Sequence, residues 1–250
     1  MKIARALIET VGNNQLESEM QDVFDELTSR KIPLELFINK KLQRRQVSLT
    51  GDTLVVAYVD SILTALKILG IEPPPTNDYP QSLQSFLHRQ IWEMSLLAFT
   101  QQIFDGSSPI FAKPKDRKKR FTGRVFSHPE DTAHLNGISK KTILLCSEVV
   151  EWLSEYRVFV IRGDIAGIQH YSGDAELNLD NSVVNTAIDV LENADEATSA
   201  YAIDFGILST GETALVEWND GFSLGSYGLD KAIYTDLLIT RWCELTGYET

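Results

Sequence analysis

Several features are missing from this chain of 250 residues. Every apolar run falls short of the roughly 20 residues that a membrane-spanning helix needs, and the opening MKIARALIET is too short for a secretory signal. The two cysteines, Cys146 and Cys243, lie in apolar stretches without the spacing of a zinc site or a disulfide framework. The phosphate-binding pattern G-x-x-x-x-G-K-[ST] is absent. We therefore expect a folded, soluble, cytoplasmic protein with reduced thiols, no membrane partner and no P-loop.

Basic charge is also scarce, since 23 Lys and Arg residues face 35 Asp and Glu residues and give a net charge of −12. Binding along nucleic-acid phosphates needs many basic contacts, so we do not expect a nucleic-acid partner. The segment KPKDRKKRFTGR, 113–124, is the local exception, with seven basic residues and one acid. Such a concentration of positive charge requires a reason.

Strands and helices alternate in the first part of the chain, which predicts a small α/β domain. We expect strands over 2–8, 34–38 and 53–59, and helices over 16–30 and 62–69. The run EPPPTNDYP, 72–80, cannot continue a helix because proline lacks the backbone donor. It predicts a boundary between domains 1–79 and 80–250.

The second part reads as mixed helix and strand. Apolar spacing predicts one long helix over 82–104, followed by a strand in PIFAKP that leads into the basic segment. Further along we expect a hairpin about Gly163, a helix over 182–191, a second hairpin and a final helix over 231–245.

The second hairpin, AYAIDFGILSTGETALVEWND, has a geometry that strand rules predict. If the loop spans 209–212, Asp204 lies directly across from Glu217, and Asn219 shares that face because alternate residues point the same way. Converging hard oxygen ligands suit Mg2+. Val216 and Trp218 then face the core. The alternative is a solvated acidic face on an ordinary hairpin, and a one-residue change of register would remove the opposition.

Lys113 ends the strand PIFAKP and precedes Thr122 and Gly123 in the basic segment. A lysine is a point charge suited to phosphate oxygens, and a Thr-Gly pair lets backbone amides approach an anion. A triphosphate fits this pattern, and so does an ordinary solvated loop.

The segment SEVVEWLSEYRVFV, 147–160, places Glu148, Glu151 and Glu155 after a strand end and Arg157 at the start of another strand. Backbone groups there are suited to an adenine edge, a carboxylate to ribose hydroxyls, and the guanidinium to a phosphate or acyl-phosphate oxygen. Surface ion pairs are the competing interpretation.

Six runs follow one another along the chain in this order: FAKP, KRFTG, EYRVFV, YSGD, AIDFGI and LVEWND. On these runs the chain resembles the R2K clade of the ATP-grasp superfamily. The resemblance covers about 80–247. It implies an α/β (α+β) ATP-grasp fold of two α+β subdomains, preceded by a small Rossmann-like pre-ATP-grasp domain.

The resemblance also implies site residues. Asp204, Glu217 and Asn219 match ligands for one or two Mg2+ ions, whereas Arg157 and Lys113 match catalytic groups near the transferred phosphate. The residues matched to ATP are Lys113, Lys119, Thr122, Glu148, Val149, Val150 and Glu155. Among them, the residues from Glu148 form the adenine hinge and Glu155 binds ribose. The usual earlier phosphate-binding lysine has no clear match, and Arg89 is the candidate to replace it.

The activity implied is an ATP-dependent carboxylate–amine (or thiol) ligase that proceeds through an acyl phosphate, on an amino acid, peptide or protein terminus. The carboxylate, the amine acceptor and the oligomeric state, including a homodimer, are left open. The alternative is a non-catalytic nucleotide-binding interaction module with the same fold, because the phosphate loop is lysine-rich rather than glycine-rich. Binding of RNA or peptide by 113–124 is a third, less favoured hypothesis.

Overall fold

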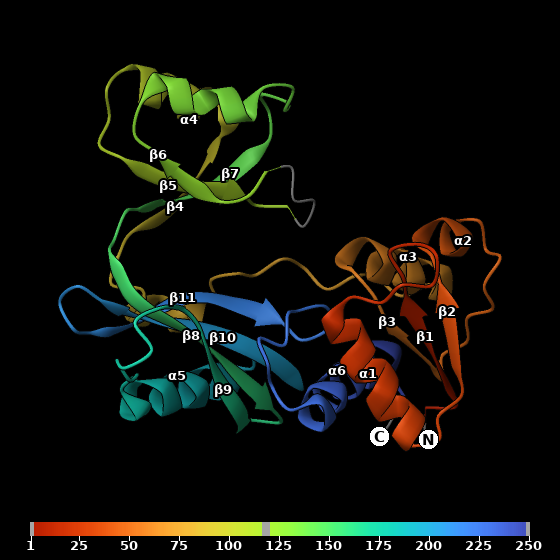
Figure 1. The fold of residues 1–250 in the computed structure, drawn as a ribbon. Helices are drawn as coiled ribbons and strands as arrows, with labels where there is room; N and C mark the ends of the chain where they lie inside the picture. Colours follow the sequence, from red (N-terminus) through yellow and green to blue (C-terminus); the bar gives the residue numbers. More distant parts are fainter. Residues whose placement is uncertain (1–2, 117–120, 249–250) are drawn as a thin grey trace. The chain divides into compact units, whose positions relative to one another are not determined.

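The computed structural model describes residues 3–116 and 121–248, which fold into two compact units (Figure 1). The first unit combines Met1–Phe86 with Leu153–Thr250, and the second is Leu87–Trp152. Because the first unit joins the two ends of the chain, it contains both the opening α/β segment and the acidic hairpin. Residues 71–80, where we expect the domain boundary, contain no helix or strand.

The opening segment forms the predicted α/β layer. Its parallel sheet has the order β2-β1-β3, so β1 lies in the middle. The strands are β1 (Arg5–Glu9), β2 (Leu34–Phe37) and β3 (Thr53–Val56), and the helices are α1 (Ser18–Ser29), α2 (Asn39–Gln43) and α3 (Val59–Leu69). Parallel neighbours need crossover connections, which the helices supply.

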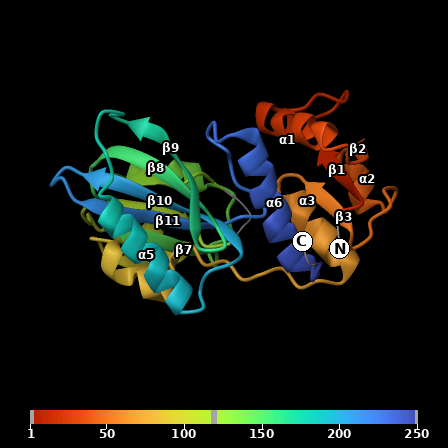
Figure 2. The ribbon, with the colours of Figure 1, turned by 90° about the horizontal axis from the view of Figure 1, so that it is seen from below.

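The second sheet of the first unit has the order β11-β10-β8-β9 and carries α5 along one face (Figures 1 and 2). Its elements are β8 (Trp152–Ile161), β9 (Asp164–Gly173), α5 (Asn181–Asn193), β10 (Ala200–Leu208) and β11 (Thr213–Asp220). Arg162 and Gly163 both have positive φ, 54° and 81°, as the two-residue turn of a tight hairpin requires. The hairpin predicted at Gly163 is therefore confirmed.

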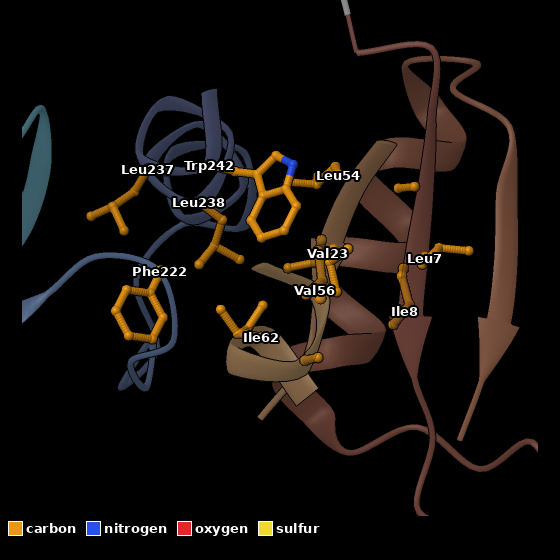
Figure 3. Packing of buried hydrophobic residues seen from close by; sticks show 14 of the residues in the cluster. Leu7, Ile8, Val23, Leu54, Val56, Ile62, Phe222, Leu237, Leu238 and Trp242 are labelled. Atoms are coloured by element: carbon orange, nitrogen blue, oxygen red, sulfur yellow. The ribbon is translucent and has the colours of Figure 1, made fainter. Parts of the chain in front are cut away.

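Helix α6 (Lys231–Thr246) shares one core cluster with residues of both sheets, and Figure 3 shows the side chains between this helix and the parallel sheet. Trp242 points from this helix toward Leu54 of β3, and Leu238 lies between Trp242 and Phe222 of the preceding loop. Each fully buried large apolar side chain contributes about 1.5–3 kcal/mol. The helix ends at Gly247, whose φ of 70° is the left-handed cap favoured by glycine.

The second unit is a small four-stranded sheet covered by one helix, in the order β4-β7-β5-β6. Its elements are β4 (Ile91–Ser95), α4 (Leu96–Phe104), β5 (Ile110–Pro114), β6 (Arg124–Phe126), the 3-10 helix η2 (Pro129–Leu135) and β7 (Ile143–Glu148). Phe99 of α4 meets Phe126 of β6 edge-on, with ring centroids 5.0 Å apart, in the centre of its core.

The single helix predicted over 82–104 is wrong. The chain instead forms the 3-10 helix η1 (Gln81–Phe86), then β4, and only then α4. His88 has a φ of 50°, which an α-helix cannot contain, and β4 pairs along its length with β7. Pairing with a distant strand thus overrides an apolar spacing that also suits a helix.

No helix in 3–116 or 121–248 combines the length and the apolar character needed to cross a bilayer.

Candidate functional site

The acidic hairpin has the predicted register. Strands β10 and β11 pair antiparallel around the loop 209–212, and Asp204 lies directly across from Glu217. A bulge follows immediately, between Asp204 and Phe205, where the register shifts. Trp218 is buried as expected, whereas Val216, next to the bulge, is only partly buried. Bulges re-aim side chains beside functional sites, and this one directly follows the carboxylate pair.

Arg157 of β8 holds Asp204 in a buried bidentate ion pair. Its Nε and Nη2 donate to the two carboxylate oxygens, each at 2.7 Å. The two side chains are only 7% and 3% exposed. Burial raises the pKa of Asp204, with Arg157 opposing and Glu217 adding to the shift. Burial also disfavours the charged guanidinium, but hydrogen bonding to Asp204 outweighs this and raises the pKa of Arg157.

The sequence did not indicate this pair. Sheet order places β8 beside β10, although the two strands are far apart in the chain. We predicted that Arg157 lies near the transferred phosphate. In the structure its guanidinium is paired with Asp204, which we predicted as a magnesium ligand.

Tyr227, in the loop between β11 and α6, is a further residue that the sequence did not single out. Its ring lies 4.7 Å from Cζ of Arg157 and stacks on Tyr171 of β9, at 5.0 Å between centroids and 26° between planes. The hydroxyl of Tyr171 donates to Oε2 of Glu155 at 3.1 Å. Glu155, the predicted ribose ligand, is therefore connected through two rings to Arg157. No motif in the sequence around Tyr227 indicated this position.

The oxygen-rich face of this hairpin fits a hard divalent cation. Nδ2 of Asn219 donates to Oδ2 of Asp204 at 3.3 Å, and Glu217 lies across from Asp204, so the three predicted ligands share one face. Carboxylate and amide oxygens are the ligands that Mg2+ accepts, completed by water and phosphate oxygens. Over the described residues, no group of three or more His, Cys, Asp and Glu side chains has metal-site geometry. The predicted set has two such residues and an asparagine.

In the second unit, Lys113 of β5 and Gly123, which directly precedes β6, lie side by side. A Cβ on Gly123 would come within 2.8 Å of the Phe111 ring and 3.1 Å of Cβ of Lys113, so a larger residue would require these side chains to shift. Thr122 is exposed beside it. The end of β5 and the residues just before β6 are therefore neighbours. Lys119 lies outside the described residues.

The predicted adenine hinge begins at the end of β7. The strand stops at Glu148, so Val149 and Val150 follow it rather than belonging to it. The carboxylate of Glu148 accepts from the backbone N–H of Gln90 at 2.9 Å. Arg89, next to it, lies over the ring of Trp152 at 5.2 Å from the centroid and donates to the Leu87 carbonyl at 3.0 Å.

A second buried ion pair lies elsewhere in the first unit. Arg241 of α6 donates to both oxygens of Asp220, at 2.6 and 2.7 Å, and to Glu244 at 2.7 Å. Glu244 also accepts from the backbone N–H and hydroxyl of Ser199, at 2.8 and 2.6 Å. This pair joins α6 to the end of β11.

Comparison with known proteins provides a sequence match and several matches in fold. The family model described as "ATP-grasp domain, R2K clade family 2" matches residues 86–237. No curated protein matches the chain by sequence.

The solved structures show the same fold at low identity. D-alanine–D-alanine ligase from Bacillus anthracis, complexed with ATP, is 12% identical, with a TM-score of 0.57 and 98% of each chain covered. D-cycloserine synthetase DcsG is 11% identical, with a TM-score of 0.60, covering 95% of this chain and 99% of the other. The ATP-grasp ligase PsnB, complexed with minimal precursor, Mg and ADP, is 9% identical, with a TM-score of 0.51, covering 97% and 98%.

Proposed function

The chain belongs to the ATP-grasp R2K clade, family 2, and from this membership we propose that it is an ATP-dependent carboxylate–amine (or thiol) ligase that works through an acyl phosphate. The observation that supports this most is the directly opposed pair Asp204 and Glu217, with Asn219 on the same face. Opposed carboxylates repel in an ordinary sheet, so their placement favours a cation between them. Mg2+ bound there would neutralise the phosphate charge of ATP.

The chemistry proposed for the site is phosphoryl transfer followed by acyl transfer. A carboxylate oxygen of the substrate attacks the γ-phosphorus, the bond to the β-phosphate oxygen breaks, and ADP leaves. The amine or thiol then attacks the acyl carbon, and inorganic phosphate leaves with the former acyl oxygen. Such reactions depend mainly on positioning and charge neutralisation, for which we propose Lys113 and Arg157. ATP is held by Thr122, Lys119, Glu155 and the hinge from Glu148 in this proposal.

The substrate class that we propose is an amino acid, a peptide or a protein terminus. Structural relatives include a D-alanine–D-alanine ligase and a ligase complexed with a precursor, although at about 10% identity these support the fold rather than the substrate. Cytoplasmic localisation and a possible homodimer remain part of the proposal.

The test is nucleotide release in the presence of Mg2+ with panels of amino acids and peptides. We expect ADP release that requires a carboxylate, and a loss of about 10²-fold or more in Glu217→Ala. Glu212→Ala is the matched control, because Glu212 is an exposed acid in the loop of the same hairpin. Wild type without turnover on any acceptor, or Glu217→Ala as active as wild type, contradicts the proposal.

A second candidate is the non-catalytic nucleotide-binding module. It is favoured by the Arg157–Asp204 pair, which occupies both oxygens of a proposed magnesium ligand. Calorimetry separates the candidates, since the module binds ATP tightly but releases no ADP with any carboxylate.

A further inference from the structure

Tyr227 is held in a backbone conformation that a tyrosine rarely adopts. Its φ is 47°, in the left-handed region, and Gly228 follows with a φ of 82°. Side chains with a Cβ are disfavoured there, and glycine or asparagine is the usual choice. A bulky residue kept at such a position suggests a task for its side chain, and the side chain lies on Arg157.

The loop around Tyr227 is fixed at several points. The backbone N–H of Ser226 donates to Oε1 of Glu19 on α1 at 2.7 Å, and Nη1 of Arg157 donates to the carbonyl of Gly225 at 3.4 Å. The hydroxyl of Tyr234 donates to the Leu224 carbonyl at 2.7 Å. Although Tyr227 is 46% exposed, the loop that carries it is therefore held by hydrogen bonds from α1, β8 and α6.

We propose that Tyr227 is a positioning residue, which holds Arg157 on Asp204 and so limits how tightly the Asp204–Glu217 pair binds a divalent cation. This inference rests on the proposed function, because it requires the metal site. It concerns a residue that neither the sequence motifs nor the carboxylate register identified.

The physical reason is competition for one carboxylate. Arg157 places a positive charge on both oxygens of Asp204, and a cation bound there meets that charge at close range. The tyrosine face attracts the guanidinium electrostatically and stabilises it in this position. Without the ring, Arg157 moves away from Asp204 at lower cost, so the oxygens become more available to metal while the arginine becomes less well placed.

The proposal predicts that loss of the Tyr227 ring strengthens metal binding rather than weakening it. A change at Tyr227 that only disturbed the fold would weaken metal and nucleotide binding together. Loss of the ring by Tyr227→Leu should instead strengthen metal-dependent binding by about two- to fivefold, the effect of a typical cation–π contact. Tyr227→Phe keeps the ring face and should bind metal as wild type does.

The experiment measures the Kd of the non-hydrolysable analogue AMPPNP by calorimetry, once with EDTA and once with excess Mg2+. The Kd with EDTA divided by the Kd with Mg2+ reports the coupling between metal and nucleotide, independently of turnover. We expect a ratio well above one in wild type, the same ratio in Tyr227→Phe, and a ratio two- to fivefold higher in Tyr227→Leu, as argued above. Phe104→Leu, an exposed aromatic on α4, is the matched control and should leave the ratio unchanged.

The possible failures are distinct. A wild-type ratio of one contradicts the metal site and with it the proposed function. If the wild-type ratio is above one but Tyr227→Leu leaves it unchanged or lowers it, only the role of Tyr227 is contradicted. Thermal unfolding of each variant confirms that the folded protein is being compared.

Discussion

The two buried Arg–Asp pairs of the first unit have nearly the same geometry and different surroundings. Arg157 and Arg241 each hold an aspartate through Nε and Nη2 at 2.6–2.7 Å. The third nitrogen of Arg241 binds the carboxylate of Glu244, whereas that of Arg157 reaches only a carbonyl oxygen at 3.4 Å. The second acid near Arg157, Glu217, is instead directly across the strands from Asp204.

This difference separates a structural role from the proposed functional one. At Arg241, Glu244 is held by both the arginine and Ser199, so the local charges are matched by hydrogen bonds. At Arg157, two acids are opposed on neighbouring strands and an aromatic ring covers the guanidinium. A buried ion pair alone is therefore weak evidence for function, and its neighbours decide the interpretation.

The largest expected effect is on turnover. Asp204→Asn should lower Mg2+-dependent ATP turnover by about 10²-fold or more, because it removes the charge of a proposed ligand for the Mg2+ that neutralises the phosphates. Asp220→Asn, at the other pair, should keep wild-type turnover per folded molecule. Steady-state rates normalised to the folded fraction check this, and equal losses in the two variants would break the comparison.

The next effect is on stability. Arg241→Met and Arg157→Met should each destabilise the protein by about 3–5 kcal/mol, because each leaves a buried carboxylate without its arginine. Added Mg2+ should restore stability to Arg157→Met, since a cation replaces the lost charge, but not to Arg241→Met. Urea unfolding with and without Mg2+ measures both. If Mg2+ restored the stability of Arg241→Met to the same extent, this would contradict the assignment of the metal site to Asp204.

The smallest effect is a pH dependence at Glu244. Burial opposes ionisation of this carboxyl, but hydrogen bonds from Ser199 and the charge of Arg241 outweigh it and lower its pKa from the ordinary 4.5. A lowered folded-state pKa gives stability that is present above 4.5 and lost as the pH falls through the lowered value. Wild type should therefore lose more stability than Glu244→Gln between pH 5 and about pH 3. Thermal unfolding as a function of pH measures this. If the unfolding temperatures of wild type and Glu244→Gln fell in parallel, protonation of Glu244 would not be linked to folding.

Local patterns predicted much of the fold and one part of the site. The turn about Gly163, the final helix and the opposition of Asp204 and Glu217 all depend on residues close together in the chain. Strand alternation and a short loop fix such a register without any knowledge of the rest of the molecule.

Contacts between distant segments could not be predicted. The apolar spacing of 82–104 suits a helix, and only pairing with β7 makes 91–95 a strand. Likewise, Arg157 meets Asp204 because β8 lies beside β10, and Tyr227 reaches Arg157 through a loop whose conformation depends on Glu19. The roles assigned to Lys113, Thr122, Glu148 and Arg89 stay predictions.

The most direct test of the central claim is to locate the metal. Crystals of the protein with AMPPNP and Mn2+ should show an anomalous Mn2+ peak about 2 Å from oxygens of Asp204, Glu217 and Asn219, with phosphate oxygens completing its shell. An ordered nucleotide whose metal lies away from these side chains, with Arg157 still on Asp204, would contradict the account.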